Sequence, residues 1–184
     1  LKDFKLAGVD KDEATREKVK KLNAEVVEIG QEFDRNIRSD KRTVIAKNVD
    51  ALDGLPTDYI ARHKPEADGT IKLTTEYPDA VPVFSYAKNE ELRKAMFMEY
   101  NNRAYPANID ALNRLIGKRH ELATTLGFPN WADFTTADKM VGSGKNARDF
   151  INGVVNASGE RAQREHERLQ GLASLGQVAR EIAH

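Results

Sequence analysis

Two histidines followed by glutamate are the residues of this sequence that come nearest to a chemical site. His120 and His166 each begin like the H-E-x-x-H pattern, in which two histidines four residues apart on one helix face bind zinc. The position of the second histidine is held by Thr124 after His120 and by Gln170 after His166. Neither stretch therefore predicts a zinc site.

The other two histidines, His63 and His184, stand far from these along the sequence. A scattered histidine is more often a surface or hydrogen-bonded residue than a metal ligand. An independent metalloenzyme that uses His63, His120 and His166 is the alternative, and the spacing disfavours it.

Phosphate binding and nucleophilic catalysis find equally little support. Gly142 and Gly144 are separated by one residue, but the lysine and third glycine of phosphate-binding loops are missing, so a hinge between helices is favoured. Ser85 and Ser143 lack the elbow motif that places a nucleophile beside its base. We therefore predict no catalytic, metal-binding or cofactor-binding residue in this sequence, and its substrate-binding residues stay unassigned.

Four aromatic residues, Tyr86, Tyr100, Tyr105 and Trp131, are the remaining candidates for a binding role. Aromatic side chains are enriched at interfaces, so these residues are compatible with a peptide-binding surface. At helical spacing they are more typical of core packing, which is the favoured interpretation.

The composition indicates a water-soluble protein without a strong electrostatic preference for its partners. Among 184 residues, 29 are lysine or arginine and 29 are aspartate or glutamate, a balance that disfavours nucleic acid and anionic membranes. No run approaches the roughly 20 apolar residues that span a bilayer. The absence of cysteine fits a reducing compartment, so we expect a cytoplasmic protein. Because the chain opens at Leu1 without a methionine, we expect it to be cut from a longer protein. A secretory signal at the start of that protein stays compatible with the sequence.

The first long helix is expected over residues 11–37. Apolar side chains recur there at steps of three and four, which predicts an amphipathic helix, and Asp10 or Asp12 is expected to cap its start.

A small antiparallel β element is expected around residues 70–86. Residues 70–75 alternate apolar and polar side chains, as a half-buried strand does. Residues 81–86 form a second extended run, which is predicted to be an edge strand because Pro82 has no N–H to donate. Residues 43–46 are β-prone but short.

Helices return in the second half of the chain. Asn89 and Asn108 are expected to cap two of them, Gly127 to end the second, and Ser143 to cap a final helix that continues past Asn156. The apolar residues expected on their buried sides include Phe97, Ile109, Leu112, Ile116, Phe150, Ile151, Val154 and Val155. The elements together predict a mainly α, bundle-like helical domain over residues 1–155 and a helical extension over residues 156–184.

Several short motifs occur together in the order found in one enzyme family. Leu52-Asp53-Gly54-Leu55-Pro56 is similar to its L-x-G-L-P element, and Asn102-Arg103-Ala104-Tyr105-Pro106-Ala107-Asn108 is similar to its N-R-x-Y-P-x-N element. Further motifs follow in the same order: Tyr77-Pro78-Asp79, Arg119-His120-Glu121-Leu122-Ala123, Leu126-Gly127-Phe128, Trp131-Ala132-Asp133-Phe134 and Asp138-Lys139-Met140. From about Leu6 to Val155, the sequence thus resembles the thimet oligopeptidase and neurolysin family of zinc metallopeptidases, which includes oligopeptidase A and dipeptidyl carboxypeptidase. The tail after Asn156 matches less well.

The resemblance implies an activity and, at the same time, a place outside the catalytic centre. Family members are mostly helical and enclose a deep channel that restricts them to short peptides, and their zinc is held further along the chain by an H-E-x-x-H helix and a later glutamate. Since this sequence contains no such motif, it corresponds to an upstream, non-catalytic portion that supplies part of the channel wall. Zinc, the peptide substrate and the missing C-terminal catalytic region are therefore expected only in the parent protein.

A second function remains open from the sequence alone. The same helices, each with one apolar side, are compatible with a stand-alone protein-interaction module that has no catalysis. A domain severed from its partner lobe is expected to dimerise through the exposed face, whereas a module is expected to have a partner protein that covers its apolar patches.

Overall fold

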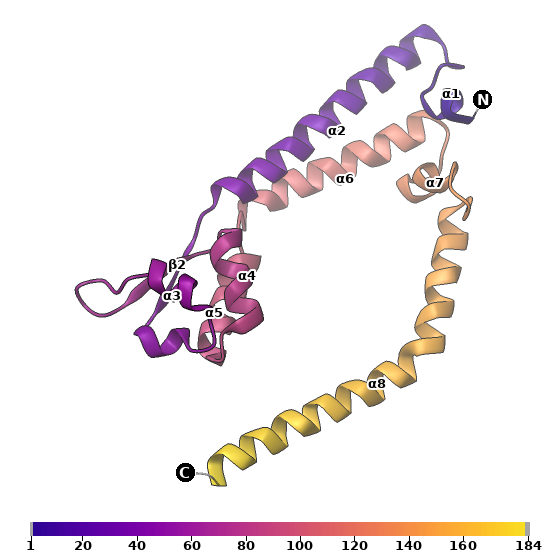
Figure 1. Ribbon diagram of the computed structural model, residues 1–184. Helices are drawn as coiled ribbons and strands as arrows, with labels where there is room; N and C mark the ends of the chain where they lie inside the picture. Colours follow the sequence, from indigo (N-terminus) through magenta and orange to yellow (C-terminus); the bar gives the residue numbers. More distant parts are fainter. Residues whose placement is uncertain (1, 183–184) are drawn as a thin grey trace. The chain divides into compact units, whose positions relative to one another are not determined.

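The computed structural model describes residues 2–182 of the chain, with side chains described for residues 4–172. The fold is mainly helical with one small antiparallel sheet, which confirms the predicted fold class (Figure 1). The elements of the first half are α1 Lys2–Leu6, α2 Glu13–Ser39, β1 Thr43–Ala46, the 3-10 helix η1 Val49–Leu52, α3 Thr57–Arg62, β2 Ile71–Thr74 and α4 Tyr77–Tyr86. Those of the second half are α5 Glu90–Asn101, α6 Ala107–Thr125, α7 Trp131–Thr136 and α8 Gly144–Ile182.

The chain divides into two compact units, one of residues 1–20 with 120–184 and one of residues 21–119. Across residues 2–182, none of the helices combines the length and the apolar character that crossing a membrane requires.

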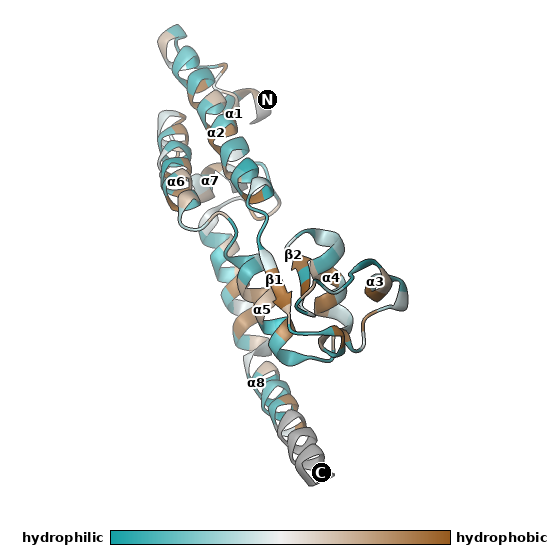
Figure 2. Cartoon of the chain, turned by 90° about the vertical axis from the view of Figure 1, so that its left-hand side faces the viewer, coloured by the Kyte–Doolittle hydropathy of each residue, from teal (hydrophilic) through white to brown (hydrophobic). Residues whose placement is uncertain are grey.

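The core of the 21–119 unit forms around the two-stranded sheet. β1 and β2 pair antiparallel, with Val44 opposite Leu73 and Ala46 opposite Ile71, and these four side chains are buried. Since alternate residues of a strand face the same side, they form one apolar face, which packs with α4 and α5. Figure 2 shows the hydrophobic residues gathered at β1, β2 and the helices beside them.

The predicted strand over residues 81–86 is wrong, because this stretch belongs to helix α4. Ala80, Val83 and Ala87 are buried, and steps of three and four bring them to one side only in a helix. Pro82 lies inside α4 rather than on an edge strand. The partner of the predicted 70–75 strand is instead the β-prone segment 43–46.

The L-x-G-L-P element builds a tight backbone crossing next to α4. Gly54 has φ +90°, and a Cβ atom at this position would lie 2.3 Å from the carbonyl oxygen of Tyr86. The two chain segments are joined there by a hydrogen bond from the Lys88 N–H to the Asp53 carbonyl oxygen, 2.9 Å long. Leu52 and Leu55 on either side of the glycine are buried in the core. The glycine is therefore required by the close approach of two backbones.

Helices α2 and α6 of the 21–119 unit share a smaller core of Ile29, Ala111 and Leu115. The predicted capping role of Asn108 is wrong, because α6 begins one residue earlier and Asn108 lies in its first turn. Its buried amide donates to the Phe33 carbonyl oxygen at 3.0 Å, and its Oδ1 accepts from the Asn36 amide at 2.8 Å. Asn108 thus fastens α6 to α2.

Asp40, which follows α2, binds the chain segment just before α6. Its Oδ2 accepts a hydrogen bond from the Ala104 N–H at 2.6 Å, where Ala104 has φ +61°, a conformation that costs a non-glycine residue energy. The same oxygen accepts from the Arg42 guanidinium at 3.1 Å. The hydrogen bond from Ala104, followed by that from Arg42, lowers the pKa of Asp40 below its ordinary value.

The other unit contains the helix ends that the sequence predicts most accurately. Asp12 caps α2 by accepting from the Thr15 N–H, and Gly127, with φ +95°, follows the end of α6. Ser143 caps α8 by accepting from the Asn146 N–H at 3.1 Å. Within the 21–119 unit, Asn89 caps α5 in the same way. The four predicted helix ends are confirmed.

Substitution of Gly54 tests the backbone crossing. Gly54→Ala is expected to lower the free energy of unfolding by about 3 kcal/mol, because the Cβ atom meets a carbonyl oxygen and φ is positive. Gly69→Ala is the matched control, since Gly69 also has positive φ but nothing lies near its Cβ position, and it should cost only about 1 kcal/mol. Urea unfolding of the two variants measures the difference, and equal losses would contradict the crossing.

Asp40 predicts a pH dependence of stability. Because its pKa is lower in the folded state, the unfolded state takes up the proton first, so the contribution of Asp40 is present above its ordinary pKa of 3.8 and is lost as the pH falls below it. Asp40→Asn is therefore expected to lower the melting temperature at neutral pH and to flatten its fall between neutral and acidic pH. Glu28→Gln, at an exposed position of α2, is the control and should leave the profile unchanged.

Candidate functional site

The two histidines of the H-E pairs lie on exposed helix surfaces and do not form a metal centre. His166 has its Nε2 atom 2.9 Å from the Gln170 amide nitrogen, and the carbonyl oxygen of His120 accepts from the Thr124 hydroxyl at 3.0 Å. Over the part of the chain that the structure describes, no three histidine, cysteine, aspartate or glutamate residues gather into a possible metal site. The described residues do not fit the zinc ion that the family resemblance implies.

His63 lies in a hydrogen-bonded network that joins α3, β2 and α4. Its Nε2 atom is 3.0 Å from the Asp79 carboxylate, and its Nδ1 atom is 2.9 Å from the Tyr59 carbonyl oxygen. The second oxygen of Asp79 accepts from the N–H of Thr74 at 2.7 Å and from its hydroxyl at 2.6 Å. Both ring nitrogens of His63 thus lie within hydrogen-bonding distance of oxygen atoms.

The hydrogen-bonded network around His63 stabilises the fold. The side chains of His63 and Asp79 are only 16% and 15% exposed. Tyr59 is buried, and burial raises the pKa of its hydroxyl above the ordinary value, so the phenol stays neutral. Its hydroxyl donates to the Asp79 carbonyl oxygen at 3.3 Å. The arrangement joins α3, β2 and α4 through hydrogen bonds to backbone groups and through the contacts of Asp79 with His63 and Thr74.

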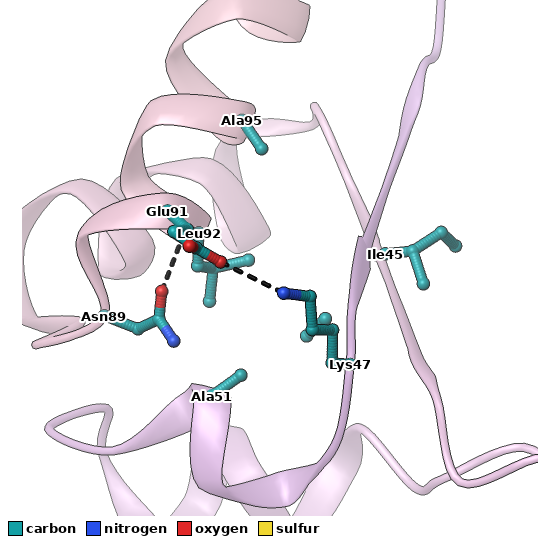
Figure 3. A pocket seen from close by; sticks show the side chains of 8 residues that line it. Ile45, Lys47, Ala51, Asn89, Glu91, Leu92 and Ala95 are labelled. Atoms are coloured by element: carbon teal, nitrogen blue, oxygen red, sulfur yellow. Dashed lines mark hydrogen bonds and ion pairs between the residues drawn. The ribbon is translucent and has the colours of Figure 1, made fainter.

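A small pocket opens between β1, η1 and the first half of α5. Its volume is about 180 Å³, and we call it the β1–α5 pocket. It is formed by apolar side chains together with a charged pair at its rim, namely Ala46, Ala51, Leu92, Ala95, Lys47 and Glu91 (Figure 3). The Lys47 ammonium lies 3.2 Å from the Glu91 carboxylate, so the rim carries no net charge. The pocket therefore suits a small uncharged group.

Two helices carry apolar faces that the sequence predicts to be buried and the structure leaves exposed. On α6, in the 21–119 unit, the α6 face consists of Ile109, Leu112 and Ile116, which are 49%, 40% and 56% exposed. On α8, in the other unit, the α8 face consists of Phe150, Ile151, Val154 and Val155, each at least half exposed. Phe97 on α5 is also more than half exposed. The expectation of burial is wrong for these residues, and contiguous apolar patches of this kind mark interaction surfaces.

The four candidate aromatic residues divide into two groups. Tyr100 packs edge to face on Phe84 with ring centres 5.5 Å apart, and Trp131 packs against Phe134 at 5.2 Å. Core packing, the favoured interpretation, is therefore confirmed for Tyr100, which packs against the core of the sheet, whereas Trp131 is half-buried on a helix that has no fully buried residue. Tyr86 and Tyr105 are instead more than half exposed, so for them the same interpretation is wrong.

Asp40, Asp79 and Asn108 are the polar residues whose roles the sequence does not reveal. Each forms a hydrogen bond with a residue that is far away in the sequence or belongs to another element. No local sequence motif predicts such a bond. The β1–α5 pocket is equally hidden, because it results from three alanines on three separate elements.

The sequence matches a known family and several of its members. Residues 83–182 match peptidase family M3, and this match runs well past Asn156 into the tail. Oligopeptidase A of Salmonella typhimurium is 25% identical over 187 residues, which cover 94% of this chain and 28% of that protein. Thimet-like oligopeptidase of Dictyostelium discoideum is 27% identical over 174 residues, covering 94% of this chain and 26% of that protein.

Saccharolysin of Saccharomyces cerevisiae is likewise 25% identical over 177 residues, covering 93% of this chain and 25% of that protein. The chain thus spans about a quarter of the length of the curated relatives it matches. The match to the family covers more than half of the residues. The chain therefore belongs to peptidase family M3.

Proposed function

We propose that this chain is a non-catalytic scaffold segment of a zinc-dependent oligopeptidase that hydrolyses short peptides. Its membership of peptidase family M3 and its span of about a quarter of the relatives support this role. The absence of an H-E-x-x-H motif from the sequence is the observation that carries it, because two histidines at that spacing are what holds a peptidase zinc. The zinc and the water it activates then belong to the parent protein.

The apolar faces of α6 and α8 support a role as one side of a larger assembly. Complete burial of an aliphatic or aromatic side chain such as Phe150 or Val154 stabilises a protein by about 1.5–3 kcal/mol. The α8 face does not contribute this stabilisation while it is exposed to water. In the proposal, the missing C-terminal catalytic region covers these faces, residues 1–155 contribute to the channel wall, and residues 156–184 extend toward that region.

The proposal includes the setting in which the parent enzyme acts. Its substrates are short peptides, and neither nucleic acid nor a membrane surface is among its partners, which the balance of 29 basic and 29 acidic residues supports. A cytoplasmic location is supported by the absence of cysteine from the sequence.

A stand-alone interaction module is the second candidate, because the exposed α6 and α8 faces would serve a separate partner equally well. The gene sequence downstream of residue 184 separates the two functions. A reading frame that continues into an H-E-x-x-H motif supports the scaffold role, whereas a stop codon close to that position supports the module.

Activity and metal content provide the first test of the scaffold role. The purified 184-residue chain, with any affinity tag removed, is expected to hold far less than one zinc ion per molecule and to leave a fluorogenic short peptide intact. Elemental analysis by mass spectrometry and a fluorescence assay measure these two properties. One bound zinc ion together with peptide cleavage would contradict the proposal.

Self-association of the isolated chain provides the second test. With no covering region present, the α8 face is expected to pair with that of another copy, and Val154→Asp should weaken the dimer at least about tenfold, because it places a charge in an apolar contact. Asn156→Asp is the control, since this residue lies on the opposite side of the same helix. Sedimentation velocity over a range of concentrations measures the effect. A chain that stays monomeric throughout, or equal effects of the two substitutions, would argue against the exposed contact.

A further inference from the structure

The outer edge of β1 has backbone groups that are open to pairing. The Thr75 N–H donates to the Arg42 carbonyl oxygen at 2.9 Å, which fixes the hydrogen-bonded pairs of the ladder at every second residue from there. Val44 and Ala46 therefore direct their N–H and C=O groups toward β2, and those of Thr43 and Ile45 point to the opposite edge. Among the described residues, no backbone or side-chain group accepts a hydrogen bond from the N–H of Thr43 or of Ile45.

The corresponding edge of β2 is treated differently by the fold. There the outward N–H of Thr74 donates to the Asp79 carboxylate at 2.7 Å. An edge strand with unpaired N–H and C=O groups attracts another strand, and side chains that bind those groups prevent this. Asp79 therefore closes the outer edge of β2 at Thr74, whereas the outer edge of β1 is open at both Thr43 and Ile45.

The open edge lies next to the β1–α5 pocket. Two ion pairs tie α5 to the two ends of β1, one between Lys47 and Glu91 at 3.2 Å and one between Arg42 and Glu99 at 3.3 Å. Between them the pocket has Ala46 on its strand side and Ala95 on its helix side. Ile45 lines the pocket as well, but in Figure 3 its side chain points away from α5.

The geometry of strand pairing directs one side chain of an added strand into this pocket. Residues that lie directly opposite each other on neighbouring strands point to the same face, with Cβ atoms about 5 Å apart. A residue placed opposite Ala46 therefore points, as Ala46 does, toward the pocket. At about 180 Å³ the pocket is smaller than the roughly 300–1,000 Å³ of typical small-molecule sites, and its apolar floor and neutral rim suit a small aliphatic side chain.

We propose that β1 binds an extended peptide segment by strand addition, with backbone hydrogen bonds to Thr43 and Ile45 and one small aliphatic side chain in the β1–α5 pocket. This binding site goes beyond the scaffold role and does not depend on it. The main-chain bonds supply affinity that is independent of sequence, and the pocket supplies the preference for an aliphatic residue.

The test uses the 184-residue chain and the peptide acetyl-Thr-Val-Thr-Val-Thr-amide. We expect the peptide to shift the amide NMR signals of Thr43 and Ile45, and the same peptide N-methylated at its threonines to leave them unchanged, because it lacks the N–H groups that pair. Ile45→Pro removes one open N–H and should weaken binding at least about tenfold. Lys72→Pro is the matched control: Lys72 lies opposite Ile45, its N–H points away from β1, and binding should stay within about twofold.

A second substitution tests the pocket without touching the strand. Ala95 is exposed on α5, and Ala95→Leu fills the pocket while leaving the β1 backbone unchanged, so binding should again fall at least about tenfold. This variant keeps the proposal testable if Ile45→Pro fails to fold. The proposal is overturned if the peptide shifts neither amide, or if Ala95→Leu binds it as well as the original chain does. It is overturned in favour of pairing between copies if both amides become protected from hydrogen exchange with rising protein concentration alone.

Discussion

Apolar burial is the constraint on which this fold depends, and the chain satisfies it only in part. Around the two strands it is satisfied well, since Ile71, Leu73 and Val83 are fully buried against one another and their neighbours. Along α6 and α8 it is not, because the α6 and α8 faces stay exposed. An apolar stripe gives a helix most of its stability only when something packs on it. In the proposed scaffold role, the exposed stripes are the surface that the segment presents to the rest of the enzyme.

Residues of the family motifs form contacts that hold the fold together. Gly54 of the L-x-G-L-P element allows the backbone to pass the Tyr86 carbonyl oxygen, and Asn108 of the N-R-x-Y-P-x-N element joins α6 to α2. Asp79 of the Tyr-Pro-Asp element binds the outward N–H of Thr74 at the edge of β2 and contacts His63. Each of these residues supports the fold by joining two elements or two chain segments. The motifs thus identify the family through its architecture, and the proposed absence of chemistry from the segment agrees with this.

Local patterns in the sequence predicted those features that local forces decide. Asp12, Asn89 and Ser143 cap helices because their side chains reach N–H groups three residues ahead, and Gly127 ends α6 because a glycine tolerates positive φ. The helical stripes of α6 and α8 were also identified, but exposure depends on what packs against a helix, which a stripe alone does not reveal. Residues 81–86 show the same limit, since their extended-looking pattern gave way to the packing of Ala80 and Val83.

The candidate binding features required long-range information. The β1–α5 pocket depends on alanines from β1, η1 and α5, and the open edge of β1 depends on a register that only the paired strands define.

Reconstitution tests the proposed scaffold role most directly. The 184-residue chain is mixed with the separately expressed downstream region of its gene, and hydrolysis of a short peptide is measured. The scaffold role predicts no hydrolysis by the chain alone and a large gain in hydrolysis when it is added to the downstream region. Hydrolysis by the chain alone, or a downstream region that is fully active without it, would contradict the account.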